Sequence, residues 1–193
     1  MHLHVQLKPY PAEPWAVGLR IHVRPLLEAD IGPHYAAWFS DPAVRQFIKF
    51  ARTEPTLDDL KKYRHTMATN LGVDFLGLFD NKDGRHIGNM KFETGPLPDE
   101  MHVGFLVGDP AWRQAGILSE ILAPCVARVR RVRGLRRVYL TVDPANTAAI
   151  RAFTKLGFES AGVINRLGAL EMDYAKGCEA SPLDGHGLRE SLT

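Results

Sequence analysis

The sequence predicts an α/β (α+β) fold with a mixed, mostly antiparallel sheet and helices on both faces. Three observations support this fold class. One alternating, strand-like segment precedes apolar residues at helical spacing in residues 29–71. Two strand-like segments then flank a sequence rich in turn formers, Asn81-Lys82-Asp83-Gly84. From residue 100 onward, strand-like and helical segments alternate before two closing strands.

The N-terminal elements are predicted to be one strand and three helices. Residues 19–24 alternate like a half-buried strand that stops at Pro25. Two short helices follow, and Asp41-Pro42 resembles the cap and first residue of the second. A third helix is capped near Thr56. The residues expected to face inward are Tyr35, Trp38 and Phe39 in the first helix, Val44, Phe47 and Ile48 in the second, and Leu57, Leu60, Tyr63 and Met67 in the third.

The remaining elements begin with an antiparallel hairpin of residues 75–79 and 87–92, joined through the turn formers. The later elements are a strand at 100–107, a helix at 115–133, a strand at 137–142, a helix at 146–156, and strands near 158–164 and 169–175. Asn146 lies near the start of the second of these helices and Gly157 at its stop. Pro124 inside the first removes an N–H, and we expect either a kink or a packing adjustment specific to the family there.

Length and composition fit one compact domain. With 193 residues and 45% hydrophobic residues, the chain is long enough to bury a substantial core, which we place at residues 17–176. Residues 1–16 contain three prolines and are predicted to form an N-terminal arm, with room for a short strand at 3–7. Residues 177–193 offer little to bury and are predicted to be disordered.

The composition argues against several classes of protein. Cys125 and Cys178 form neither a disulfide framework nor a metal-binding spacing. No charge-free apolar stretch is long enough to cross a bilayer, and the start lacks a secretory signal, so we expect a cytoplasmic protein without membrane partners. The net charge of +2 gives no case for nucleic-acid binding.

A cluster of arginines lies at the end of the long helix and in the loop that follows. Its members are Arg128, Arg130, Arg131, Arg133, Arg136 and Arg137. The favoured interpretation is a solvated face whose cations complement the carboxyl end of the helix dipole. A surface for an acidic substrate or partner is the alternative, whereas a nucleic-acid patch lacks interleaved aromatic residues.

Residues 112–119 follow an apolar strand and open a helix, which makes their backbone a candidate anion site. The first turn of a helix has N–H groups without intrahelical partners and the positive end of the dipole. Residues 114–119 are therefore placed to donate to a pyrophosphate, and Gly116 allows close approach. The alternative is that Gly116 serves only as a connector between strand and helix.

Two segments resemble the acyl-CoA-binding core of the GNAT acetyltransferases. Residues 113–118 resemble the motif Arg/Gln-x-x-Gly-x-Gly/Ala, and residues 146–158 resemble Asn-x-x-Ala-x-x-x-Tyr-x-Lys-Leu-Gly-Phe. Residues 24–30 and 38–44 are similar to the opening of the subgroup that contains the ribosomal-protein N-terminal serine and alanine acetyltransferases. The resemblance covers about residues 19–176, and it implies a GNAT-like sheet.

The resemblance also implies the co-substrate and its contacts. Acetyl-CoA is the implied donor, and a primary amine attacks its thioester. The implied binding residues are Phe105, Leu106 and Val107 along the pantetheine arm, Arg113, Gln114, Ala115, Gly116, Ile117, Leu118 and Ser119 around the pyrophosphate, and Asn146 and Phe153 beside the arm. Each of three residues also has an alternative interpretation. Asn146 equally fits a helix cap and Phe153 an ordinary core aromatic residue, while Arg113 fits a surface residue.

Glu100 and His102 are the candidate general bases, because the family often places a base near the beginning of the central strand. Glu100 also fits a solvated strand edge beside Asp99, and His102 also fits a hydrogen-bonded histidine on the sheet.

The attacking amine must be neutral. At pH 7 about one α-amine in ten is neutral, against about one lysine amine in a few thousand.

The sequence departs from the family pattern at the general acid. Phe153 stands where a tyrosine usually protonates the thiolate, and Ala149 stands where the subgroup can use a serine. Leu118 replaces a Gly or Ala of the phosphate loop, although its backbone N–H is unaffected. A thiolate whose parent pKa is near 8.5 can leave without an acid, with water as the proton source.

We therefore expect an acetyl-CoA-dependent N-acetyltransferase that acts on a protein N-terminus or on a small molecule such as an amino sugar. The alternative is a non-catalytic acyl-CoA-binding or scaffold protein that has kept the fold. A monomer and a homodimer both remain open. A nucleotide hydrolase is disfavoured because the sequence contains no Gly-x-x-x-x-Gly-Lys-Ser/Thr.

Overall fold

The fold is one twisted sheet of eight strands in the order β1-β2-β3-β4-β5-β6-β8-β7, seen in a computed structural model that describes residues 13–45, 54–165 and 168–175. Neighbouring strands are antiparallel except for β5 and β6. The predicted strand at 3–7, the inward positions Phe47 and Ile48, and Cys178 lie outside the described residues.

The strands are β1 (Ala16–Val17), β2 (Ile21–Pro25), β3 (Val73–Asp80), β4 (His86–Thr94), β5 (Glu100–Val107), β6 (Arg137–Val142), β7 (Phe158–Ile164) and β8 (Leu170–Tyr174). The α-helices are α1 (Pro33–Ala37), α2 (Pro42–Arg45), α3 (Leu57–Thr69), α4 (Leu118–Arg133) and α5 (Thr147–Leu156), and short 3-10 turns are η1 (Glu28–Asp30), η2 (Trp38–Ser40) and η4 (Pro110–Trp112). The predicted fold class is confirmed.

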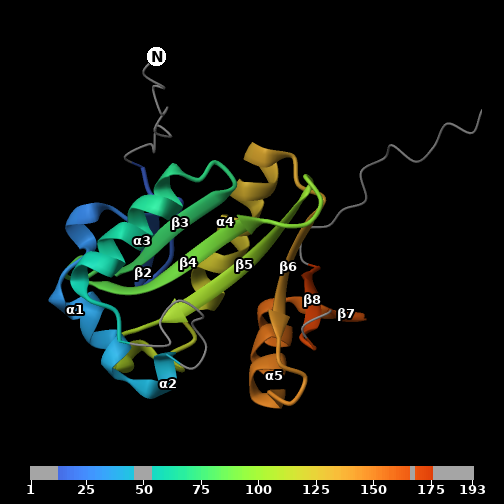
Figure 1. The fold of residues 1–193 in the computed structure, drawn as a ribbon. Helices are drawn as coiled ribbons and strands as arrows, with labels where there is room; N and C mark the ends of the chain where they lie inside the picture. Colours follow the sequence, from blue (N-terminus) through green and yellow to red (C-terminus); the bar gives the residue numbers. More distant parts are fainter. Residues whose placement is uncertain (1–12, 46–53, 166–167, 176–193) are drawn as a thin grey trace, which may run out of the picture.

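The sheet separates two hydrophobic cores, because alternate side chains of each strand point to opposite faces. On one face, Met90 and Phe92 of β4 pack with residues of α4 and α5. On the other face, Tyr35, Phe39 and Leu60 from α1, η2 and α3 form the second core with residues of β3. Figure 1 shows α1–α3 on one side of the central strands and α4 on the other.

Local sequence signals set the helix boundaries. Thr56 and Asp59 form a reciprocal capping box at the start of α3. Gly134 and Gly157 end α4 and α5 in the left-handed conformation, with φ of 65° and 104°. Pro124 lies on an exposed part of α4, which is helical from Leu118 to Arg133 without interruption.

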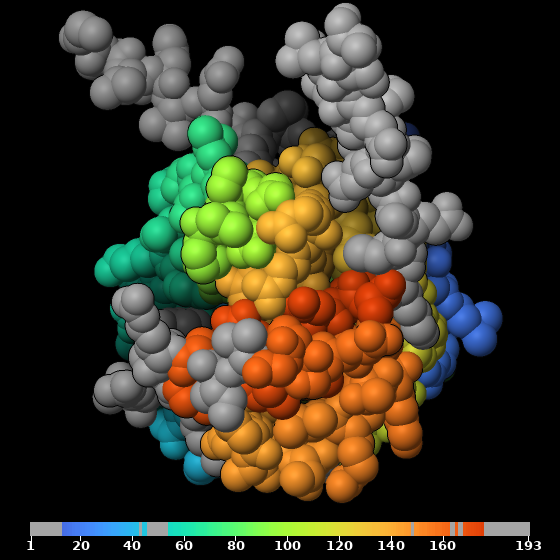
Figure 2. All heavy atoms as spheres, turned by 90° about the vertical axis from the view of Figure 1, so that its right-hand side faces the viewer, coloured from blue at the N-terminus to red at the C-terminus, as the bar shows by residue number. Residues whose placement is uncertain are grey.

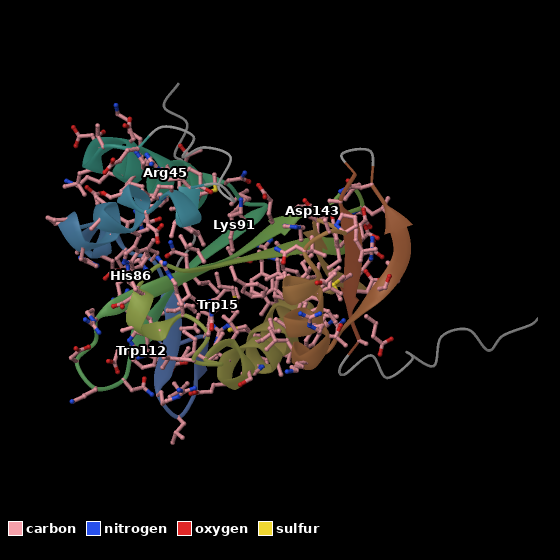
Figure 3. All side chains as sticks on the ribbon, turned by 90° about the horizontal axis from the view of Figure 1, so that it is seen from below. Trp15, Arg45, His86, Lys91, Trp112 and Asp143 are labelled. Carbon is pink, nitrogen blue, oxygen red and sulfur yellow. The ribbon has the colours of Figure 1, made fainter. Side chains whose placement is uncertain are left out.

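His86 is a buried histidine at the start of β4, among the rings of Tyr35, Trp38 and Phe79 (Figure 3). Its Nε2 lies 2.9 Å from the Gly88 carbonyl oxygen and 2.9 Å from Asn89 Oδ1. Nε2 therefore carries the hydrogen and donates, whereas Nδ1 has no partner among the described residues. Burial lowers the pKa of His86 to about 4.

This pKa predicts acid sensitivity. The unfolded chain holds a proton on this histidine below about pH 6.5, whereas the folded chain binds it only near pH 4. Between about pH 6.5 and pH 4 the unfolded state therefore binds more protons than the folded state. The free energy of unfolding thus falls by on the order of 3 kcal/mol as the pH drops through this range. Urea titrations at several pH values should show this slope in the wild type and in His65→Gln, an exposed control. In His86→Gln the slope should flatten, and an unchanged slope would assign it to other groups.

Candidate active site

Strands β5 and β6 separate after a short stretch of parallel pairing. The paired residues are Glu100 with Arg137, Met101 with Val138, and His102 with Tyr139. Beyond these pairs, β5 continues to Val107 and β6 to Val142 without further pairing between them. Figure 1 shows the two strands meeting at one end and diverging toward the other. The edge of β5 that faces β6 can therefore pair with an extended, amide-containing chain.

The three strand residues expected along the pantetheine arm all lie on this unpaired part of β5, at 105–107. On the other side, β5 pairs with β4 along almost its whole length, from Gly88 opposite Val107 to Thr94 opposite Met101. One edge of β5 is thus held rigidly while the other is open. We call this unpaired stretch between β5 and β6 the slot.

Ion pairs around Arg137 hold the closed end of this slot. Arg137 of β6 lies 3.5 Å from Glu100 Oε1 on β5, 2.9 Å from Glu171 Oε2 and 2.7 Å from Asp173 Oδ1 on β8. Its guanidinium carbon also lies 4.4 Å from the ring centroid of Tyr139. These contacts bring three strands together where the parallel pairing begins.

The open end of β5 leads into the loop before α4, where two residues adopt left-handed backbone conformations. Gln114 has a φ of 59° and Gly116 a φ of 71°. In the described part of the chain, the N–H groups of Gln114, Gly116, Ile117 and Leu118 have no hydrogen-bond acceptor. They lie at the positive end of the α4 dipole, so this loop has the properties of an anion site.

The structure differs from the sequence prediction in where this helix begins. Helix α4 starts at Leu118 rather than at residue 115, because the left-handed residues break the helical path. The Leu118 side chain packs against the core, and a Cβ built on Gly116 would meet no atom within 4 Å. The space above the loop is therefore open despite the leucine.

Two side chains brace the loop and the first turn of α4. Arg20 donates from Nη2 to the Ala115 carbonyl oxygen at 2.9 Å and pairs through Nε with Glu120 at 2.6 Å. Although burial raises it, hydrogen bonds from Arg20 hold the pKa of Glu120 below its usual value. Ser119 donates from Oγ to the Gly116 carbonyl oxygen at 2.7 Å. The hydroxyl of Ser119 is thus used within the loop.

The Arg113 guanidinium is bound by protein acceptors outside the loop that carries the free N–H groups. Its Nη1 is 2.7 Å from Asp41 Oδ2, at the start of α2, and its Nη2 donates to the Gly108 carbonyl oxygen at 2.9 Å. The guanidinium therefore faces the helices that cover the opposite core. The side chain is 31% exposed, so it lies at the surface, where protein acceptors hold it.

Helix α5 brings Asn146 and Phe153 to the other side of the slot. Asn146 accepts a hydrogen bond from the Ala149 N–H at 3.0 Å, so it caps the helix. The Phe153 ring is half-buried, 6.4 Å from the ring of Phe105 on β5 and 6.1 Å from that of Phe158. The wall that α5 gives the slot is apolar at Phe153.

The two candidate bases occupy different environments. His102 is the last residue of β5 that pairs with β6. It is half-buried, and its Nε2 lies 3.2 Å from the hydroxyl oxygen of Thr141 on β6. Glu100 is only 6% exposed and lies at the closed end beside Arg137, so its interpretation as a solvated strand edge is wrong. His102 stands where the slot begins to open, and Glu100 belongs to the ion-pair cluster behind it.

Tyr139 does not supply the missing acid at the slot. Burial raises the pKa of its hydroxyl. A Cβ at Gly95, in the loop after β4, would lie 3.2 Å from this hydroxyl oxygen, which places the hydroxyl toward the closed end. A tyrosine on β6 therefore belongs to the same cluster as Arg137 and Glu100.

Sequence reasoning missed two side chains of β4 that share the face of His102. Glu93 lies opposite His102, and Lys91 lies opposite Gly104, above which a Cβ would meet nothing within 4 Å. Although burial lowers it, contacts with Tyr63 and Glu93 raise the pKa of Lys91 above its ordinary value. Figure 3 shows Lys91 on the central strands, between the α1–α3 layer and the strands β6–β8. The alternation of β4 places both residues on this face, but only the pairing register brings them beside β5.

Some members of the arginine cluster are held in ion pairs and others are exposed. Arg133 pairs at 2.8 Å with Asp74, which is 4% exposed. Arg136 pairs with Asp99 at 2.9 Å, although 64% of its side chain is exposed. The expected solvated face therefore holds for Arg136, whereas Arg133 and Arg137 tie the end of α4 and the following strand to the rest of the sheet.

Three further observations concern a cysteine, metal ligands and membrane spans. Cys125 is buried, and burial raises the pKa of its thiol to about 12, which removes it as a nucleophile. Within the described ranges, no group of three metal-binding side chains occurs. No helix among those residues is long and apolar enough to span a bilayer.

Comparison with known proteins identifies the family. The model of the acetyltransferase (GNAT) domain matches residues 20–159 of this chain. The chain belongs to the GNAT acetyltransferases. No curated protein sequence matches it.

Solved GNAT structures share the fold at low sequence identity. RimL, a ribosomal alpha-N-protein acetyltransferase solved with coenzyme A, is 14% identical, with a TM-score of 0.71 over 83% of this chain and 96% of its own. A putative ribosomal-protein-serine acetyltransferase from Vibrio cholerae is 14% identical, with a TM-score of 0.68 over 85% and 97%. A GNAT acetyltransferase from Bacillus anthracis is 17% identical, with a TM-score of 0.67 over 82% and 95%. At these identities the similarity shows the fold alone.

The loop geometry predicts different effects for alanine at the two ends of α4. Gly116 and Gly134 both have positive φ and open space around a Cβ position, so either substitution should destabilise the fold by about 1 kcal/mol. Only Gly116→Ala puts a methyl group above the free N–H groups, and it should weaken acetyl-CoA binding about tenfold, or 1.4 kcal/mol. Calorimetric titration of both variants checks this, and equal affinities would move the anion site away from the loop.

Proposed function

We propose that this GNAT protein transfers the acetyl group of acetyl-CoA to a primary amine of a protein N-terminus or of a small molecule such as an amino sugar. The observation that carries the proposal is the slot between β5 and β6, with free N–H groups at its open end and His102 at its start. The distance along β5 from His102 to Val107 is roughly 16 Å at the usual rise per residue. The slot thus offers a straight path from an anion site to a candidate base. We also propose a cytoplasmic location on the sequence grounds given above.

In the proposed reaction, the nitrogen of the neutral amine bonds to the thioester carbonyl carbon and the carbon–sulfur bond breaks. His102 takes the amine proton on Nε2, directly or through a water molecule. This role requires the tautomer whose hydrogen is on Nδ1, so that Nε2 has a lone pair to accept the amine proton. The Thr141 hydroxyl oxygen, 3.2 Å from Nε2, then accepts the hydrogen of the imidazolium that forms. An α-amine demands less of a base than a lysine amine does, because about one α-amine in ten is already neutral at pH 7.

The leaving thiolate receives its proton from water in this proposal. Phe153 and Ala149 carry no donor, and Phe153 is packed between two other phenylalanines. A thiolate with a parent pKa near 8.5 leaves without prior protonation, so the missing acid slows the reaction without blocking it. The same observation favours the second candidate function, an acyl-CoA-binding or scaffold protein without turnover.

Binding and turnover measured together decide between these functions. We expect calorimetry to show acetyl-CoA binding, and a thiol-release assay to show turnover with one class among N-terminal peptides, amino sugars, polyamines and amino acids. Binding without thiol release for any amine would favour the acyl-CoA-binding alternative. Absence of binding would contradict both functions.

The two candidate bases should separate in mutant kinetics. His102→Gln should lower kcat about 100-fold or more while acetyl-CoA affinity is kept, because only the proton acceptor is lost. Glu100→Gln should instead lower the free energy of unfolding by about 1–3 kcal/mol, since it weakens a buried ion pair, with kcat kept within a few fold. Thr141→Val removes the hydroxyl beside Nε2, and its loss of kcat should lie between those of the other two variants. Unchanged turnover in His102→Gln would exclude it as the base.

A further inference from the structure

Arg113 connects the loop before α4 to the helical layer on the other face of the sheet. Its Nη1 pairs with Asp41 at 2.7 Å, while Nη2 and Nε point to the carbonyl oxygens of Gly108 and Val107 at 2.9 and 3.4 Å. All three guanidinium nitrogens of Arg113 are thus directed at protein acceptors. To reach a bound phosphate, this side chain would have to leave a carboxylate and two carbonyl groups.

A second contact joins the same two regions. The Trp38 ring occupies the space that a side chain at Gly108 would fill, so it lies directly on the end of β5. Asp41 follows three residues later, and its carbonyl oxygen accepts the N–H groups of Val44 and Arg45 at 3.0 and 3.2 Å, which starts α2. The segment from Trp38 to Arg45 is therefore attached to the β5–α4 junction at two points.

We propose that Arg113 and Asp41 are positioning residues that fix the segment at 38–45, a wall on the Lys91 and His102 side of the sheet, to the loop that holds the donor. The proposal rests on the proposed function, because it takes this face as the side of the amine. In this proposal neither residue touches donor or acceptor. The backbone of Arg113 runs directly into Gln114, whose N–H is free, so an anion held by the loop restrains the backbone that anchors the bridge.

This arrangement couples the two substrates. Acetyl-CoA on the loop orders the wall, and an acceptor amine then binds to a wall that is already placed. By linkage, each substrate tightens the other by the same factor. The pair is partly exposed, with 31% of the Arg113 side chain and 35% of the Asp41 side chain accessible, so its effect lies in orientation more than in stability.

Three single substitutions test this coupling. Asp41→Asn removes the charge at constant size, and Arg113→Lys removes the planar fork. Arg85→Gln is the control, because Arg85 pairs with Asp109 of the same junction at 3.5 Å without contacting the wall. Acetyl-CoA affinity is measured by calorimetry, amide hydrogen exchange is followed at 33–45 with and without coenzyme A, and the acceptor KM and kcat are determined.

We expect Asp41→Asn and Arg113→Lys to keep acetyl-CoA affinity within about threefold, to lose the protection that coenzyme A gives to residues 33–45, and to raise the acceptor KM about tenfold with a smaller change in kcat. Arg85→Gln should behave as the wild type. The proposal is overturned if both variants keep that protection. It is also overturned if Arg113→Lys weakens acetyl-CoA binding tenfold while Asp41→Asn changes nothing, since Arg113 would then be a phosphate ligand.

A failure of the proposed function would be distinguishable. If the wild type binds no acetyl-CoA, the exchange of residues 33–45 is compared without ligand. Faster exchange in Asp41→Asn and Arg113→Lys than in the wild type and Arg85→Gln then supports the connection. Equal exchange in all four proteins overturns it.

Discussion

The parallel pairing of β5 with β6 ends after His102 and Tyr139, and the rest of the site depends on that ending. A continuous ladder would use the backbone groups of residues 103–107 within the sheet. Because the pairing stops, β5 keeps one free edge while β4 holds the other. The opening is built into the strand directions and needs no movement of the sheet to form.

The two faces of the slot differ in chemistry. On the side of α4 and α5, Phe105 and Phe153 form an apolar wall, with the buried Phe158 behind Phe153. On the other side lie His102 and the charged residues of β4. A sheet can provide both because neighbouring residues of one strand face opposite ways. The same strand therefore contributes an apolar lining and a candidate base.

The sequence predicted what is decided locally. Thr56, Asn146 and Gly157 act within a few residues of their own positions, and the structure has each of them at the helix end expected. The resemblance indicated the loop before α4 as a candidate phosphate site, but it did not indicate the left-handed Gln114, which delays the start of α4.

Contacts between distant residues could not be predicted in this way. Arg113 finds its carboxylate 72 residues earlier in the chain, and nothing near either residue indicates the other. Glu100 and His102 look equivalent in the sequence, since both occupy the same face of one strand. The register with β6 separates them, because it puts one against Arg137 and the other at the opening.

Figure 2 shows how closely α5, β7 and β8, the last part of the described chain, pack into one end of the molecule.

The cluster around Arg137 has an uneven tolerance to sequence change. One guanidinium serves carboxylates from two neighbouring strands, so a neutral residue at any one acidic position leaves the arginine with two partners. A neutral residue at 137 would instead leave three carboxylates facing one another, one of them only 6% exposed. A single substitution at an acidic position therefore weakens the cluster without dismantling it. A change at 137 removes the guanidinium that joins carboxylates of β5 and β8 across β6.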